Sequence, residues 1–330
     1  MRSSGCDGNS MRSAYATLLC VVVIWALSPA VNKLLYAYTS PTVTSVLVAF
    51  FSFLALLVYC RRELSCLDKR YFAVAVPTGL AKALASLVQK VGLLYTTPAA
   101  YAFLENLSCV IVPILMFCFI RKRPSLLTVL SSCLCLFGAF VLCGVGVGDL
   151  RFGIGEALCA LAGVGYAFNI AGTGCFARDL KPSLYVLIHM GVSTLVSLAS
   201  TVLFGRIEFG GAPIAPVYFS FLSLPIILLL ALVSNVLCWI LRTRSITRIN
   251  PSTVAVIMPL SAVLATSFSI LLGTDTFSVD LLLGGGIILA SILLSTLGDR
   301  LDGGRYPKKA GNLPDKKHSK EKDDGKKRTA

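Results

Sequence analysis

Apolar residues gather in long, nearly uninterrupted runs along this chain, and each run ends at charged residues, proline or glycine. Ten runs approach the ~20 residues that a helix needs to cross the hydrocarbon core of a bilayer. They cover residues 14–35, 42–60, 72–93, 98–120, 126–144, 153–175, 183–204, 218–240, 251–272 and 279–297. Strands of a membrane barrel would instead alternate over ~10 residues. The pattern therefore predicts an all-α membrane protein with ten transmembrane helices, since lipid offers backbone polar groups no other partner.

Composition supports a membrane environment. Hydrophobic residues make up 56% of the 330 positions and charged residues 14%, whereas soluble domains average about 25% charged residues. The formal net charge of +14 would also suit a nucleic-acid-binding protein. However, 11 of the 30 Lys and Arg residues lie between Arg300 and Arg328, and most others lie in short loops. This placement indicates topology signals and a basic tail near anionic lipid headgroups, and no nucleic-acid partner is expected.

The basic residues also predict the orientation of the chain. One set of alternate loops contains Arg61, Arg62, Lys69, Arg70, Arg121, Lys122, Arg123, Arg178, Lys181, Arg242, Arg244 and Arg248. The opposite set contains only Arg151 and Arg206, beside several acidic residues. Because cytoplasmic loops are enriched in Lys and Arg, both termini are expected in the cytoplasm. The first run is too long for the apolar part of a cleavable signal, and Met11 could serve as the start as well as Met1.

A weak internal repeat divides the chain after the fifth run. Trp25 and Pro41 lie sixteen residues apart, as do Tyr166 and Pro182, and the two pairs share an offset of 141. With five helices in each half, the second half must enter the membrane from the opposite side, as in alternating-access transporters. The predicted organisation is a cytoplasmic segment at 1–13, a first repeat at 14–144, an inverted second repeat at 145–298 and a disordered basic tail at 299–330.

Three segments resemble the drug/metabolite transporter superfamily, in particular its EamA-like family. They are residues 24–41, with Trp25-Ala26 and Pro41; residues 91–115; and residues 250–273, with Asn250-Pro251. The resemblance implies two inverted five-helix halves, a central cavity and transport of a small organic solute. Because the resemblance is to the bacterial branch, the bacterial inner membrane is the expected location, and a eukaryotic organelle is the alternative. Many relatives have Glu-Pro where this chain has Met258-Pro259, and Gly-Glu where it has Gly273-Thr274. No role of those acids can be transferred.

Ionisable side chains inside membrane helices are costly and are therefore candidates for function. Lys82 lies at the middle of the third run, and Gln89 lies two turns further on the same face. On the fourth run Tyr101, Glu105 and Ser108 follow helical spacing. We expect Lys82 and Glu105 to flank the cavity, with Lys82 meeting an anionic group of the solute and Glu105 pairing with Lys82 or titrating. The alternative is an ion pair that only locks two helices together.

Further candidates lie in the second half. Tyr166 and Asn169 share one face of the sixth helix, and Asn235 and Trp239 share one face of the eighth. Aromatic and amide groups of this kind can orient a solute in a cavity, or they can form hydrogen bonds between helices. For His189, in the seventh run, the structural role is the favoured interpretation.

The sequence lacks the motifs that the alternative functions would require. The sequence has no Gly-x-Ser-x-Gly or His-Glu-x-x-His motif for an intramembrane enzyme, and its 2 histidines exclude a multi-histidine metal site. Its glycines precede no Gly-Lys-Ser/Thr, so direct use of ATP is not expected. We therefore expect a secondary transporter without catalytic residues, metal or cofactor; the alternative is a membrane protein without transport activity or an intramembrane enzyme. Coupling to protons, exchange or a gradient stays open, as does a homodimer.

Overall fold

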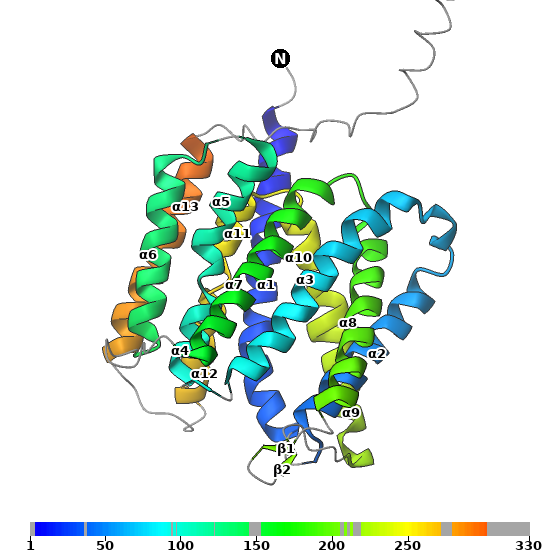
Figure 1. Cartoon of the computed structure of the whole chain (residues 1–330). Helices are drawn as coiled ribbons and strands as arrows, with labels where there is room; N and C mark the ends of the chain where they lie inside the picture. Colours follow the sequence, from blue (N-terminus) through cyan, green and yellow to red (C-terminus); the bar gives the residue numbers. More distant parts are fainter. Residues whose placement is uncertain are drawn as a thin grey trace, which may run out of the picture.

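The computed structural model describes residues 4–35, 38–93, 95–96, 98–121, 123–144, 153–204, 208–209, 212–213, 219–271 and 279–301. Long helices lie side by side in a bundle (Figure 1). We call the end of the bundle where α1 begins and α13 finishes the terminal end, which is uppermost in Figure 1. The predicted basic tail lies outside the described residues, apart from its first three positions.

In the first half of the chain, the described residues form six α-helices. They are α1 (Ser4–Leu35), α2 (Pro41–Tyr59), α3 (Lys69–Leu93), α4 (Pro98–Glu105), α5 (Ser108–Ile120) and α6 (Leu126–Leu142), with a short 3₁₀ turn at Leu64–Cys66. Capping residues explain several of the starts. Ser40 accepts a hydrogen bond from the Val43 amide just before Pro41, and Ser125 accepts one from the Thr128 amide. Both arrangements satisfy amides that the first helical turn leaves without a partner.

The second half contains α7 (Ile154–Phe176), α8 (Pro182–Phe204), α9 (Leu224–Leu229), α10 (Cys238–Ile246), α11 (Pro251–Ile257), α12 (Leu260–Leu271) and α13 (Val279–Leu301). Between α9 and α10 the chain forms a π-helical segment, η3 (Leu230–Leu237), and a 3₁₀ turn at Phe221–Ser223 precedes α9. Two strands of two residues, β1 (Glu208–Phe209) and β2 (Ala212–Pro213), pair antiparallel. Asn250 caps α11 by accepting from the Ser252 amide.

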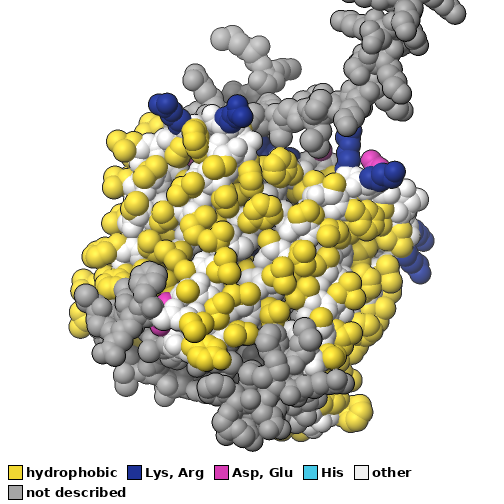
Figure 2. All heavy atoms as spheres, in the orientation of Figure 1, with side chains coloured by type: hydrophobic (Ala, Val, Ile, Leu, Met, Phe, Trp, Pro, Cys, Tyr) yellow, Lys and Arg dark blue, Asp and Glu magenta, His cyan; other side chains and the backbone are white. Residues whose placement is uncertain are grey.

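Most of these elements are long and apolar enough to cross a membrane. Among the described residues, eight such stretches are Arg12–Asn32, Lys69–Gln89, Ala102–Ile120, Ile154–Phe176, Pro182–Val202, Phe221–Ile246, Pro251–Phe268 and Val279–Asp299. Two shorter apolar helices are Val43–Tyr59 and Leu126–Leu142. Figure 2 shows a flank covered by hydrophobic side chains, with Lys and Arg gathered toward the terminal end. An apolar flank of this extent is what a lipid-facing surface requires.

Close packing between helices depends on small residues. α6 and α13 lie along each other (Figure 1), and Gly284 of α13 touches the backbone of α6. A Cβ on Gly284 would lie 2.7 Å from the Leu142 Cα, and one on Gly138 would lie 2.9 Å from the Ile288 side chain. Glycines at such contacts let two helices approach closely, which is a main source of attraction between helices in lipid.

Several predicted boundaries differ from the structure. α1 already begins at Ser4, inside the predicted N-terminal segment, and α13 continues to Leu301, three residues into the predicted tail. The run 98–120 is interrupted at residues 106–107, and the run 251–272 is interrupted at residues 258–259. At the first interruption the Asn106 side chain donates to the Ala102 carbonyl and competes with the helical backbone. At the second, Pro259 has no amide hydrogen to continue the helix.

Candidate functional site

Two neighbouring cavities lie among the helices. The serine cavity has a volume of about 390 Å³ and is lined by Ser28, Ser45, Ser86, Ser193, Ser197 and Ser234, together with Asn32 and Asn235. The break cavity has a volume of about 270 Å³ and is lined by residues from both interrupted helices, including Glu105, Asn106, Met258 and Pro259. Trp25, Lys82 and Trp239 line both cavities. The two tryptophans therefore stand where the cavities meet, with ring centroids 5.8 Å apart.

Most of the predicted candidates meet at these cavities. Lys82, Glu105, Tyr166, Asn169 and Trp239 line the break cavity, as does Ser108. Asn235 lies in η3 and lines the serine cavity. The Tyr101 side chain lies outside the described residues. Because η3 is π-helical and the fourth run is interrupted, the continuous α-helical stripes predicted there are wrong, although Ser108 and Asn235 still face a cavity.

A chain of polar side chains holds the wall of the break cavity. Gln89 is only 2% exposed and lines neither cavity. Its amide nitrogen donates to the Glu105 carboxylate at 3.2 Å, and its oxygen accepts from the Tyr166 hydroxyl at 2.7 Å. Gln89 therefore lies behind two residues of the wall and sets their positions, a role that its spacing from Lys82 did not predict.

Lys82 reaches the second half of the molecule. Its ammonium lies 3.5 Å from the Ser193 hydroxyl of α8 and 4.7 Å from the centre of the Trp239 ring. Lys82 and Glu105 line the same cavity, as predicted, yet the contacts described for each lead to different partners. Direct pairing of the two charges stays a prediction.

Arg242 lies inside a helix, whereas the sequence pattern predicted a loop at this position. Its assignment to a cytoplasmic loop is wrong, because the helix continues past residue 240 to Ile246, and Arg242 is only 5% exposed. Its guanidinium donates to the Asn169 side-chain oxygen at 3.3 Å and lies 4.7 Å from the Trp239 ring centre. Helical spacing contained a signal, since Arg242 follows Trp239 by three residues and Asn235 by seven.

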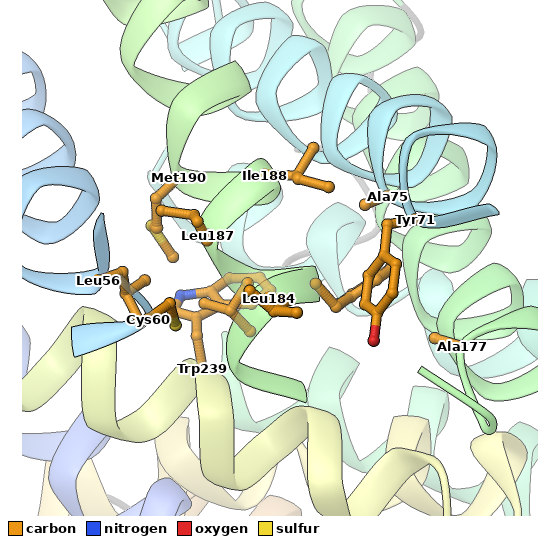
Figure 3. Packing of buried hydrophobic residues seen from close by; sticks show 12 residues of the cluster. Leu56, Cys60, Tyr71, Ala75, Ala177, Leu184, Leu187, Ile188, Met190 and Trp239 are labelled. Carbon is orange, nitrogen blue, oxygen red and sulfur yellow. The ribbon is translucent and has the colours of Figure 1, made fainter. Parts of the chain in front are cut away.

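Trp239 also belongs to an apolar cluster. The cluster includes Leu56, Cys60, Leu184, Leu187 and Met190 (Figure 3). His189 also belongs to this region and is 1% exposed. It shares a hydrogen bond of 3.0 Å with the Thr78 hydroxyl, and its ring stacks 4.5 Å from that of Tyr185. These contacts fit the structural role that was favoured for His189.

The terminal end of the bundle is tied by a second polar group. The Asp299 carboxylate, near the end of α13, accepts from the Tyr15 hydroxyl of α1 at 3.1 Å. It also accepts from the Asn250 amide at 3.1 Å and from the Thr253 hydroxyl at 2.7 Å, at the start of α11. Three helices from both halves of the chain are thus joined at this end.

Comparison with known protein families identifies the family to which the chain belongs. The family model of the EamA-like transporter family matches residues 12–144 and 153–297. The chain therefore belongs to the EamA-like transporter family and is an integral, multi-pass membrane protein of a family of small-solute transporters, not of enzymes. The two matched segments show that the family unit occurs twice.

A solved structure supports the fold. One chain, titled only "Crystal structure of protein", superposes with a TM-score of 0.71 at 15% sequence identity. The match covers 88% of this chain and 99% of that chain. At this identity the likeness shows the fold alone. A search of curated proteins gives no match.

Proposed function

We propose that this protein is a secondary transporter that moves a small organic metabolite by alternating access. Ten membrane helices would form two inverted repeats, residues 14–144 and 145–298. In this scheme α4–α5 and α11–α12 each count as one interrupted span, as does α9–η3–α10. The observation that supports the proposal most strongly is the pair of interrupted helices, one in each repeat, whose breaks face one cavity.

The two interruptions correspond in position and oppose each other in direction. Each follows a proline that opens its span, Pro98 in the first half and Pro251 in the second, by about two helical turns. α4 lies at the end opposite the terminal end, whereas α11 lies toward the terminal end (Figure 1). Interrupted helices at corresponding places in inverted repeats are where transporters of this kind bind solute, because free backbone groups there line a cavity.

The helix contacts also come in matched pairs. α1 packs against α10 and α12, and α7 packs against α3 and α5. If α1 corresponds to α7, α3 to α10, and α5 to α12, each contact has a counterpart under a two-fold operation that exchanges the repeats. α6 and α13, the last helices of each half, pack on each other. This arrangement supports rocking of one repeat against the other around a central site.

Alternating access requires contacts that can open at one end of the cavity. The bonds of Asp299 to Tyr15, Asn250 and Thr253 close the terminal end in this conformation. The apolar cluster around Trp239 lies beside the cavities. We infer that the other conformation breaks the contact between Asp299 and Tyr15, because this contact joins α13 of the second repeat to α1 of the first.

The distribution of basic residues supports an orientation in the membrane. Basic side chains gather at the terminal end (Figure 2), which we assign to the cytoplasm. The resemblance to the bacterial branch of the family favours a bacterial inner membrane as the location. The basic tail would contact anionic headgroups. No nucleotide-binding motif occurs in the sequence, so movement would be driven by a solute or ion gradient.

Reconstitution tests the proposed function. Liposomes containing the purified protein are loaded with a mixture of amino acids, carboxylates, sugar phosphates and nucleosides, and retained solutes are measured by mass spectrometry against protein-free liposomes. We expect selective loss of one chemical class, and acceleration by the same solutes outside. Retention equal to that of protein-free liposomes for every solute would reject transport of these classes.

A further inference from the structure

The guanidinium of Arg242 lacks a charged partner among the residues that the structure describes. One of its terminal nitrogens donates to the oxygen of the neutral Asn169 amide, while its Nε has no hydrogen-bond acceptor in the described part of the chain. Arginine stays protonated inside proteins and has five N–H donors. Burial of a charge without an opposite charge is costly unless another group supplies one. Arg242 also lines the break cavity, so the missing acceptor can come from a bound solute.

A second cation lies on the same aromatic ring. The Lys82 ammonium and the Arg242 guanidinium carbon are each 4.7 Å from the centre of the Trp239 ring. Lys82 belongs to α3 and Arg242 to α10, so each half of the chain contributes one cation. Like charges near each other in a medium of low dielectric constant repel. An anion between them would relieve that repulsion.

The break cavity has an excess of positive charge. Among the described side chains that line it, Lys82 and Arg242 are cationic, and Glu105 is the one carboxylate. The Glu105 carboxylate accepts its hydrogen bond from Gln89. Even with Glu105 fully ionised, the described side chains of the lining sum to one positive charge. This charge balance favours an anionic solute over a cationic one.

We propose that the break cavity binds a small organic anion, whose carboxylate or phosphoryl oxygens bind Arg242 and Lys82. Arginine recognises such oxygens with two parallel N–H donors, and its Nε supplies one of them. Trp25 and Trp239 contact the carbon skeleton, and Tyr166 lines the cavity on α7. The volume of 270 Å³ favours a small metabolite. The assignment rests on the proposed transport function and names its class of substrate.

The two tryptophans provide a direct binding assay. The whole chain contains 2 Trp residues, and both line the break cavity. Intrinsic tryptophan fluorescence of the detergent-purified protein therefore reports on the place where the break cavity and the serine cavity meet. The Arg242 variants assign a response to the break cavity, because the Arg242 side chain lines the break cavity and not the serine cavity. The probes are matched pairs at constant ionic strength: succinate with succinamide, glutamate with glutamine, and glucose 6-phosphate with glucose. We expect at least one anion to change the fluorescence saturably, and its neutral partner to have no effect.

Charge variants test whether Arg242 and Lys82 are responsible. Arg242→Gln is expected to weaken the apparent affinity for the anion by about tenfold or more. Arg244→Gln removes the same charge from an exposed position two residues further on and should leave the affinity unchanged. If Arg242→Gln does not fold, Arg242→Lys and Lys82→Gln provide the same comparison, since each alters one anion contact while leaving the other cation in place.

Two outcomes would overturn the anion site. One is binding of neutral partners as tight as that of the anions, or no response to any anion. The other is anion affinity that is unchanged in both Arg242→Gln and Lys82→Gln. The reconstituted liposomes separate this proposal from the proposed function: binding of an anion that is never transported rejects the transporter, whereas transport of a neutral solute that is insensitive to Arg242→Gln rejects the anion site.

Discussion

Helices α6 and α13 pack tightly against each other, whereas the helices around the break cavity leave an open space with a polar lining. α6 and α13 approach so closely that Gly284 meets the backbone at Leu142, and α6 has no charged residue along its length. Around the break cavity, helices stand far enough apart to leave about 270 Å³ lined by two cations and a carboxylate. We therefore expect stability to depend mainly on tight contacts between helices such as α6 and α13. We expect selectivity to depend on the polar groups of the cavity, whose burial lowers stability. Substitutions in the two regions should therefore have separable effects.

The largest expected effect is at the tight contact. Gly284→Ala would place a methyl group 2.7 Å from the Leu142 Cα, so the two helices must separate. We expect a loss of about 1–3 kcal/mol of folding free energy, the usual cost of overpacking, and a lower apparent Tm in detergent. Gly286→Ala is the matched control, because a Cβ there meets nothing within 4 Å. An equal effect of both substitutions would show that the α6–α13 contact is not tight.

The next effect is on transport alone. Lys82→Met preserves the length of the side chain beside Trp239 and removes one of the two cations. We expect the initial transport rate in proteoliposomes to fall by about tenfold or more, with little change in Tm, because a charge contact to solute is lost. Lys69→Met, an exposed position at the start of the same helix, should behave like the unsubstituted protein. A normal rate for Lys82→Met would remove Lys82 from the substrate site.

The same comparison shows what could be predicted from the sequence. The apolar runs identified the helices because twenty residues without charge can hardly be accommodated except in lipid. The ionisable residues inside those runs, Lys82 and Glu105, pointed to the cavity for the same energetic reason. Both predictions depend on the local composition of the chain, which a single sequence contains in full.

Features that depend on neighbouring helices were not predicted. Arg242 was assigned to a loop because a hydropathy pattern treats any arginine as the end of a span, whereas here Asn169 and two indole rings from other turns and helices surround it. The interruption at residues 106–107 depends on one side-chain hydrogen bond of Asn106, which competes with the helix only in this local geometry. The residues that Gly284 contacts depend on which helix packs against α13, here α6.

A smaller effect is expected behind the cavity wall. Tyr166→Phe removes the hydroxyl that donates to Gln89 at 2.7 Å while keeping the ring. A single hydrogen bond of this kind contributes about 1 kcal/mol, so the apparent Tm should fall slightly. Because Gln89 also positions Glu105, we expect the KM for the transported solute to rise more than the maximal rate falls. A KM equal to that of the unsubstituted protein would show that Gln89 holds Glu105 without Tyr166.

The smallest effect concerns charges that face water. The Lys181 ammonium lies 3.2 Å from the Glu63 carboxylate between two loops at the terminal end, with both side chains more than two-fifths exposed. The hydrogen bond and charge of Glu63 raise the pKa of Lys181. A raised pKa contributes stability below the pKa of the unfolded chain, near 10.4 for lysine, and that stability is lost only as pH rises above it. Between about pH 6 and 9 this pair should therefore not make the stability vary with pH. Lys181→Gln should leave the Tm nearly unchanged, since exposed ion pairs contribute little. A measurable loss of Tm for Lys181→Gln would show that this exposed pair stabilises the protein more than exposed ion pairs usually do.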